Sequence, residues 1–287
     1  MRKTTLIRYV LSFWLALPIG YALLYPQVLR CQIIAYSPDF RRLTTGTNPL
    51  YISHDTPRPQ QERLLREFGR AESRIRQFWG EQRGRAVLIY CPTQAQYERY
   101  CVGGEGAGCS VGLPWGASYL ILGPEGNSAD VIAHELCHDE LLARLGWFTV
   151  KRQVPQWFNE GLALMLDYRF VAPADSGRGA DVARQRANDY RDEWQFRTHG
   201  EQFVLDLDHL ESTRDFFWGD YNRVMLAYMT AGMEVSRWLA DVGRAGLITL
   251  VDRVADGAPF IDTYRQIEQA HQTKARPSGR AGSRRID

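Results

Sequence analysis

The spacing of apolar residues predicts much of the secondary structure of this chain. Between residues 58 and 79, apolar side chains recur every three or four positions, which is typical of a helix with one buried face. Three short runs of β-forming apolar residues are expected to be strands: 49–55, 85–91 and 117–123. A short helix is expected at 93–100, where Thr93 is a candidate N-cap.

The second half of the chain is predicted to be mainly helical. A helix that contains "AHELCHDELLARLG" begins near Ser128, with Asn127 as the candidate N-cap, and ends at Gly146. Pro155 opens the next helix, "PQWFNEGLALMLDYR". Further helices are expected at three places: 219–242, 246–255 and 260–270. The polar residues 171–215 are expected to form loops. The sequence therefore predicts an α+β fold, with a small mixed sheet in the N-terminal half and a helical C-terminal half.

The first thirty residues have a different character. Basic residues precede an uncharged run from Tyr9 to Leu29, and Arg30 follows it. Since about 20 apolar residues span a bilayer, we expect residues 1–8 to be a cytoplasmic stub and residues 9–29 to be an uncleaved transmembrane helix. The positive charge before the span favours an extracytoplasmic, periplasmic position for the rest of the chain. A cleaved signal peptide and a buried soluble helix are the alternatives.

The rest of the chain divides into a linker at 30–48, one domain at 49–270 and a disordered basic tail at 271–287. The formal net charge of +2 gives no field suited to nucleic acid, so no nucleic-acid partner is expected. The glycine-rich loop between Cys101 and Cys109 favours a disulfide, with Cys91 as a competing partner. Such a bond would indicate an oxidising compartment.

The stretch "DVIAHELCHDE", residues 130–140, carries the candidate chemistry. On a helix, His134 and His138 lie on one face a turn apart, where two imidazoles can hold one zinc ion. Glu135 is offset by about 100° from His134, so it does not coordinate the ion but can reach a water that the ion holds. This is the arrangement of H-E-x-x-H hydrolases. The alternative is an ordinary solvated helix face, which the mostly apolar neighbours of the motif disfavour.

A catalytic zinc site needs a third protein ligand. Glu160 lies 22 residues after His138 on the following helix, and a helical hairpin can bring it back to the histidine pair. The two segments "HELCH" and "PQWFNEGLA" together resemble the gluzincin zinc metallopeptidases, in particular the peptidase MA-like group. The resemblance is specific over 117–170 and looser over 49–116 and 216–255.

The resemblance implies a zincin-like pair of active-site helices and one zinc ion bound by His134, His138 and Glu160. It also implies that Glu135 is the general base in peptide hydrolysis, and that an edge strand, for which 117–123 is the candidate, pairs with extended substrate. We therefore expect a membrane-anchored metallopeptidase that acts on peptides or proteins. The alternative is a catalytically silent zincin-fold protein, tethered to the membrane, that binds or scaffolds a partner.

Two supporting roles have several candidates. A donor to the oxyanion is expected on a downstream helix. The candidates are Tyr221, which we prefer, and His199, His209 and Tyr228. Asp167 and Asp139 are both candidates to orient a histidine through a hydrogen bond. Cys137 points elsewhere on the helix and is not expected to bind the metal.

Overall fold

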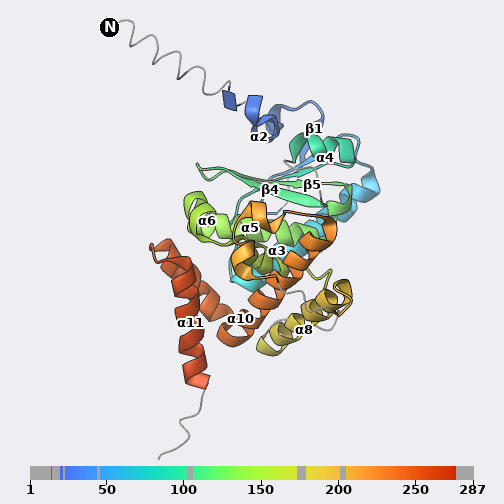
Figure 1. The fold of residues 1–287 in the computed structure, drawn as a ribbon. Coiled ribbons are helices and arrows are strands. Elements are labelled where there is room, and N and C mark those ends of the chain that lie inside the picture. Colours follow the sequence, from blue (N-terminus) through green and yellow to red (C-terminus); the bar gives the residue numbers. More distant parts are fainter. Residues whose placement is uncertain are drawn as a thin grey trace, which may run out of the picture.

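A small sheet and a larger helical part form the fold (Figure 1). The computed structural model describes Trp14, Gly20, Tyr21 and residues 23–43, 46–101, 106–172, 179–200 and 205–275. Within these residues the sheet has five strands of mixed direction, and helices form most of the rest. The predicted α+β class is therefore confirmed.

The sheet has the strand order β1-β2-β3-β5-β4. Its strands are β1 (Phe40–Leu43), β2 (Leu50–Ser53), β3 (Val87–Tyr90), β4 (Gly108–Gly112) and β5 (Ser118–Leu122). β2, β3 and β5 run parallel, whereas β1 and β4 pair antiparallel at the two edges. The expectation that 117–123 is the edge strand is wrong, because the unpredicted strand β4 pairs with the outer side of β5.

Helices cover one face of the sheet and form the main core with it. The helices of this part are α3 (Arg58–Trp79), α5 (Ala129–Leu145), α6 (Trp147–Gln153), α7 (Gln156–Leu164), α10 (Tyr221–Ala255) and α11 (Phe260–Ala275). Leu120 and Leu122 of β5 point to this face and belong to the same buried cluster. Helix α10 bends at Gly243, whose φ of 65° separates the two predicted helices at 219–242 and 246–255.

The other face of the sheet is covered by shorter elements. These are α2 (Pro26–Gln32), the 3-10 turn η1 (Ile34–Tyr36) and α4 (Gln94–Tyr100), whose N-cap Thr93 accepts a hydrogen bond from the Gln96 N–H as predicted. Tyr119 and Ile121, which alternate along β5 with the residues of the main core, pack into this second cluster. The sheet therefore separates two apolar layers.

Residues 26–43 are folded onto the domain. Residues 30–48 are not a linker as predicted, because Cys31 and Ile34 are buried against the sheet and Phe40 begins strand β1. Helix α2 begins at Pro26, inside the predicted membrane span. Among the described residues, no helix is both long and apolar enough to cross a membrane. The predicted stub, most of 9–29 and residues 276–287 lie outside the described residues.

Part of the segment 171–215, predicted as loops, forms helix α8 (Ala180–Arg197), while α9 (Thr213–Phe216) is a single short turn. Two buried side chains fix α8 to the core. The Tyr190 hydroxyl donates to the Leu164 carbonyl at 3.0 Å, and the Arg186 guanidinium donates to the Met165 carbonyl at 2.8 Å. Gly232 of α10 makes room for the Tyr190 ring, which would lie 3.0 Å from a Cβ at that position.

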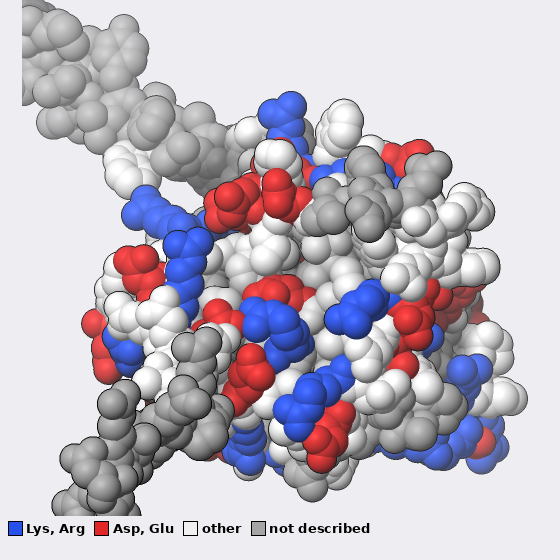
Figure 2. All heavy atoms as spheres, turned by 60° about the horizontal axis from the view of Figure 1, so that its bottom comes forward, with Lys and Arg blue, Asp and Glu red and all other residues white. Residues whose placement is uncertain are grey.

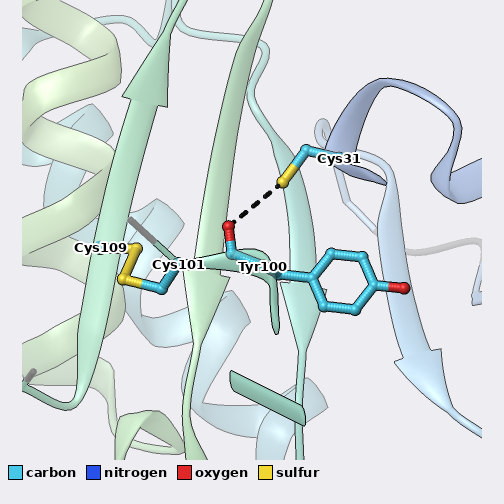
Figure 3. The surroundings of a disulfide bond; sticks show 4 residues. All are labelled: Cys31, Tyr100, Cys101 and Cys109. Carbon is cyan, nitrogen blue, oxygen red and sulfur yellow. Dashed lines mark hydrogen bonds between the residues drawn. A yellow bond between two sulfur atoms is a disulfide. The ribbon is translucent and has the colours of Figure 1, made fainter. Parts of the chain in front are cut away.

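A disulfide joins Cys101 and Cys109, as the loop between them favours (Figure 3). Cys91, the competing partner, is a buried free thiol, as are Cys31 and Cys137. The Cys31 thiol on α2 donates to the carbonyl of Tyr100, next to the disulfide, at 3.7 Å. The disulfide therefore ties the end of α4 to the edge strand β4, beside the place where α2 is packed.

The face formed by the C-terminal helices carries mixed charge. In Figure 2, lysine and arginine side chains are interspersed with aspartate and glutamate. Arg237 of α10, for example, binds Glu234 at 2.7 Å and Glu268 of α11 at 2.6 Å. A surface of this kind has no extended field of one sign.

Candidate metal centre

Helix α5 holds the H-E-x-x-H motif in the interior. Its N-cap Ser128 accepts a hydrogen bond from the Val131 N–H at 3.3 Å, and its C-cap Gly146 has a φ of 77° that favours glycine. Almost every residue between these caps is buried, including both histidines and Glu135. The predicted helix, its start near Ser128 and its end at Gly146 are thus confirmed, but the N-cap is Ser128 and not Asn127. The burial of the motif excludes the ordinary solvated face.

Helix α7 brings Glu160 to the two histidines. Pro155 stands at its N-cap, as the sequence indicates. The adjacent Gly161 allows α7 to approach α10 closely, because a Cβ there would lie 2.5 Å from the Ala231 carbonyl oxygen and 2.6 Å from Val235. This contact presses α7 into the core and directs Glu160 toward α5.

The three side chains converge in the geometry of a metal site. Glu160 Oε2 lies 3.2 Å from His134 Nε2 and 3.6 Å from His138 Nε2. Ligands that bind one zinc ion tetrahedrally at 2.0–2.1 Å lie about 3.3 Å apart. Possible ligand atoms of all three residues lie within 4.8 Å of one another, and all three residues are buried. The site fits one metal ion, and its donors are two nitrogens and one oxygen.

Neighbouring oxygens orient both imidazoles. Nδ1 of His134 lies 3.6 Å from Asp167 Oδ2, and Nδ1 of His138 donates to Asn159 Oδ1 at 3.0 Å. Placing the proton on Nδ1 leaves the Nε2 lone pair of each ring free to bind a cation. Asp167 is held in turn by Arg169, which donates to its two carboxylate oxygens at 2.9 and 2.5 Å.

Glu160 has its own support. The Gln156 amide, one turn earlier on α7, donates to Glu160 Oε1 at 2.7 Å, which leaves Oε2 directed at the histidines. Neither Gln156 nor Asn159 had been assigned a role from the sequence. Both stand in the motif "PQWFNEG", and their i−4 and i−1 positions relative to Glu160 are the signal that could have revealed them.

The electrostatics of the site match a cation-binding cluster. Burial disfavours a charged His134, but the nearby carboxylates of Asp167 and Glu160 outweigh burial and raise its pKa to about 10. Burial likewise opposes a charged Glu160, yet the nearby His138 and His134 lower the pKa of that carboxyl. A negative carboxylate beside two imidazoles therefore attracts positive charge, whether a proton or a metal ion supplies it.

Glu135 lies next to the metal-binding group and is not part of it. A Cβ at Gly108 would be 3.1 Å from Cγ and 3.2 Å from Oε1 of Glu135, so this side chain packs directly against the edge strand β4. Burial raises the pKa of Glu135. A carboxylate of raised pKa beside a candidate metal site and the edge strand β4 suits proton transfer.

The remaining candidates are distributed differently. Tyr221 is 72% exposed at the start of α10, and His199 and His209 are also exposed. Tyr228, two turns along α10 from Tyr221, has its ring centroid 6.3 Å from that of His134. Cys137 lies on α5 between the two histidines but is buried in the main core and does not join the group His134, His138 and Glu160.

Asp167 and Asp139, the two candidates to orient a histidine, have different contacts. Asp167 faces His134, whereas Asp139 points to β3, where its Oδ2 accepts from the Ala86 N–H at 2.9 Å.

We expect Asp167→Asn to lower zinc affinity roughly 10- to 100-fold. Asp139→Asn is the matched control and should lower the free energy of unfolding by about 1–3 kcal/mol with unchanged zinc affinity. Competition with a zinc-sensitive chelator and urea unfolding measure the two effects; equal zinc affinity in both variants would contradict this assignment.

Comparison with known proteins yields no relative: no protein-family model and no curated protein matches the sequence. The function is therefore inferred from the residues of the metal centre and their surroundings.

Proposed function

We propose that this protein is a zinc-dependent metallopeptidase of the gluzincin type, anchored to a membrane by its N-terminal segment. The observation that carries the proposal is the convergence of His134 Nε2, His138 Nε2 and Glu160 Oε2 within one buried cluster, with Glu135 beside it. Structural zinc sites are usually closed by four protein ligands, whereas catalytic sites use three and keep one position open.

The donor set favours zinc. Two imidazole nitrogens and one carboxylate oxygen form the ligand set of well-known zinc hydrolases, whereas calcium and magnesium prefer oxygen donors alone. When bound at such a site, zinc supplies a Lewis acid that makes a water molecule acidic near neutral pH. The protein's own contribution is to fix the ligands through Asp167, Asn159 and Gln156.

Glu135 has the position for proton transfer. Its side chain packs against Gly108 of β4 and directly follows the proposed ligand His134 in the sequence, so its carboxylate can accept a proton from a water molecule and deliver it to the leaving amine. The edge of β4 offers backbone groups with which an extended peptide can pair. Pairing there would bring the scissile bond next to Glu135, because Gly108 of β4 contacts that side chain.

Tyr228 is the better candidate for the oxyanion donor. Its ring lies next to His134 and packs against Phe216 at a centroid distance of 5.2 Å, whereas Tyr221 is largely exposed. Burial, with the nearby Glu160 and Glu135, raises the pKa of Tyr228, so its hydroxyl stays protonated and can donate.

Tyr228→Phe is expected to lower kcat roughly 100-fold while the zinc content is unchanged. Tyr221→Phe, the control, also removes one tyrosine hydroxyl from α10 and is expected to leave kcat nearly unaltered. Steady-state cleavage of a fluorogenic peptide measures both. A larger loss of kcat in Tyr221→Phe than in Tyr228→Phe would restore Tyr221, the residue preferred from the sequence.

The full-length protein, loaded with zinc and mixed with a broad set of peptides, tests the proposed activity. We expect new peptide termini by mass spectrometry, loss of cleavage after chelation, and recovery when zinc is restored. A protein that binds one zinc ion but cleaves none of the peptides would instead support the catalytically silent scaffold.

A further inference from the structure

The N-terminal segment has an apolar surface that the domain does not cover. Six of the twelve exposed large hydrophobic side chains of the described residues lie between positions 14 and 36: Trp14, Leu23, Leu24, Tyr25, Ile33 and Tyr36. Tyr36 is 87% exposed and Leu23 76% exposed. Such a concentration in one short segment is unusual for a surface that faces only water.

Helix α2 and η1 are apolar on two opposite sides. Val28, Cys31 and Ile34 are buried against the sheet and α4. Tyr25, Leu29, Ile33 and Tyr36 recur every three or four positions from the N-cap of α2 to the end of η1, and three of these four side chains are exposed. A helix that is apolar on both sides is normally covered on both sides. The second covering must come from outside the described chain.

The position of α2 in the sequence indicates what covers it. The uncharged run from Tyr9 to Leu29 leads directly into α2, so the exposed stripe continues the segment expected in the membrane. Tyr25 and Val28 are less than one turn apart, which is about 5 Å along a helix. The apolar run therefore reaches into the folded domain, because its residue Val28 is already buried there, and no flexible linker separates the two.

We propose that the stripe Tyr25, Leu29, Ile33 and Tyr36 lies in the interface of a lipid bilayer and holds the domain against the membrane in a fixed orientation. Tyrosines are enriched at that interface, where their rings meet lipid and their hydroxyls meet water. Arg30 supports the docking, because its guanidinium donates to the Arg99 carbonyl at 2.9 Å and joins α2 to α4.

The orientation has a consequence for the substrate. Helix α2 lies on one face of the sheet, and α5 and α7 with the metal centre lie on the other (Figure 1). A bilayer in contact with α2 is therefore separated from the metal centre by the sheet. Peptide bonds in segments outside the membrane can reach the site, whereas bonds within the bilayer cannot. The docking rests on the proposed membrane anchor and is independent of peptidase activity.

Environment-sensitive labels on the full-length protein test the docking. Tyr36→Cys and, as a matched control, Phe196→Cys introduce single exposed thiols for an NBD label; Phe196 is 76% exposed on α8, far from α2 in Figure 1. The native free thiols are buried, and burial raises the pKa values of Cys31 and Cys91 to about 12, so they should resist labelling. Unchanged zinc content shows that each labelled protein is folded.

The labelled proteins are reconstituted into phosphatidylcholine and phosphatidylglycerol vesicles with or without bromine on the acyl chains. We expect bromine to quench the label at position 36 roughly twofold or more, with no quenching at position 196. Equal quenching at both positions would overturn the proposal. So would a shielded but unquenched label at position 36, which would indicate a second copy of the chain on the stripe. If the protein does not float with the vesicles in a density gradient, the proposed anchor is wrong, and so is the docking. This result would not bear on peptide cleavage.

Discussion

Glu135→Gln should leave one zinc ion bound while it lowers the rate of peptide cleavage roughly 10²- to 10⁴-fold. The substitution keeps the size and shape of the side chain, which packs against Gly108 of the edge strand. It removes the negative oxygen that accepts a proton from water. Since Glu135 is not one of the three metal-binding residues, metal content should not change. Zinc stoichiometry by mass spectrometry of the metal and kcat on a fluorogenic peptide give the two readings.

Glu140→Gln is the matched control for this variant. Glu140 is a fully buried glutamate on the same helix, but its carboxylate accepts from the Arg83 and Gly84 backbone N–H groups and binds Arg144. We expect it to lose stability and to retain both zinc and cleavage. If Glu135→Gln cleaved peptides at the wild-type rate, Glu135 could not be the base, even with the metal in place.

Glu160→Ala is expected to weaken zinc binding by more than roughly 100-fold. The change removes the only carboxylate among the three converging ligands and leaves the Gln156 amide without its 2.7 Å partner. Two imidazoles from one helix turn remain, which are too few for a stable tetrahedral site. Isothermal titration calorimetry, in which zinc is added to protein that a chelator has freed of metal, measures the affinity.

Glu72→Ala separates loss of the ligand from loss of the fold. Glu72 is equally buried, but it lies on α3 and accepts from the Thr47 N–H at 2.9 Å. This variant should lose stability and keep wild-type zinc affinity. Zinc affinity that is the same in Glu160→Ala and in the wild type would refute the three-ligand assignment.

The cluster of His134, His138 and Glu160 was predictable because its members lie close together in the sequence. His134 and His138 share one helix, and the sequence indicates its start near Ser128 and its end at Gly146. Glu160 follows on α7, and only the short helix α6, which the sequence did not predict, lies between α5 and α7. Chain connectivity thus leaves few ways to arrange the three side chains, and little information from distant parts of the chain is needed.

Helix α8 and strands β4 and β1 were not predicted, because tertiary packing rather than local composition determines their structure. Helix α8 is polar over most of its length, and it is held in place by packing against α10 and by the hydrogen bonds of Tyr190 and Arg186 to the end of α7 and the turn that follows it. Strand β4 has the sequence Gly-Cys-Ser-Val-Gly, which is weakly β-forming by itself and is fixed by pairing with β5. Strand β1 is not evident from the sequence, because its two arginines interrupt the apolar pattern around the buried Phe40.

The choice between Tyr221 and Tyr228 shows the same limit. The two residues stand seven positions apart on one helix, so helical periodicity alone gives them nearly the same direction. What distinguishes them is how far each lies along α10 from the metal helix, and this depends on the packing of α10 against α7 at Gly161. No local pattern in the sequence encodes that distance.

Zinc K-edge X-ray absorption on the wild-type, zinc-loaded protein tests the central claim most directly, because it reports the ligand atoms themselves. The convergence of His134, His138 and Glu160 predicts only nitrogen and oxygen neighbours at about 2.0–2.2 Å, with the outer-shell scattering of two imidazole rings. A sulfur shell at about 2.3 Å would place a cysteine such as Cys137 in the coordination sphere. Either that result or fewer than two imidazoles would contradict the proposed metal centre.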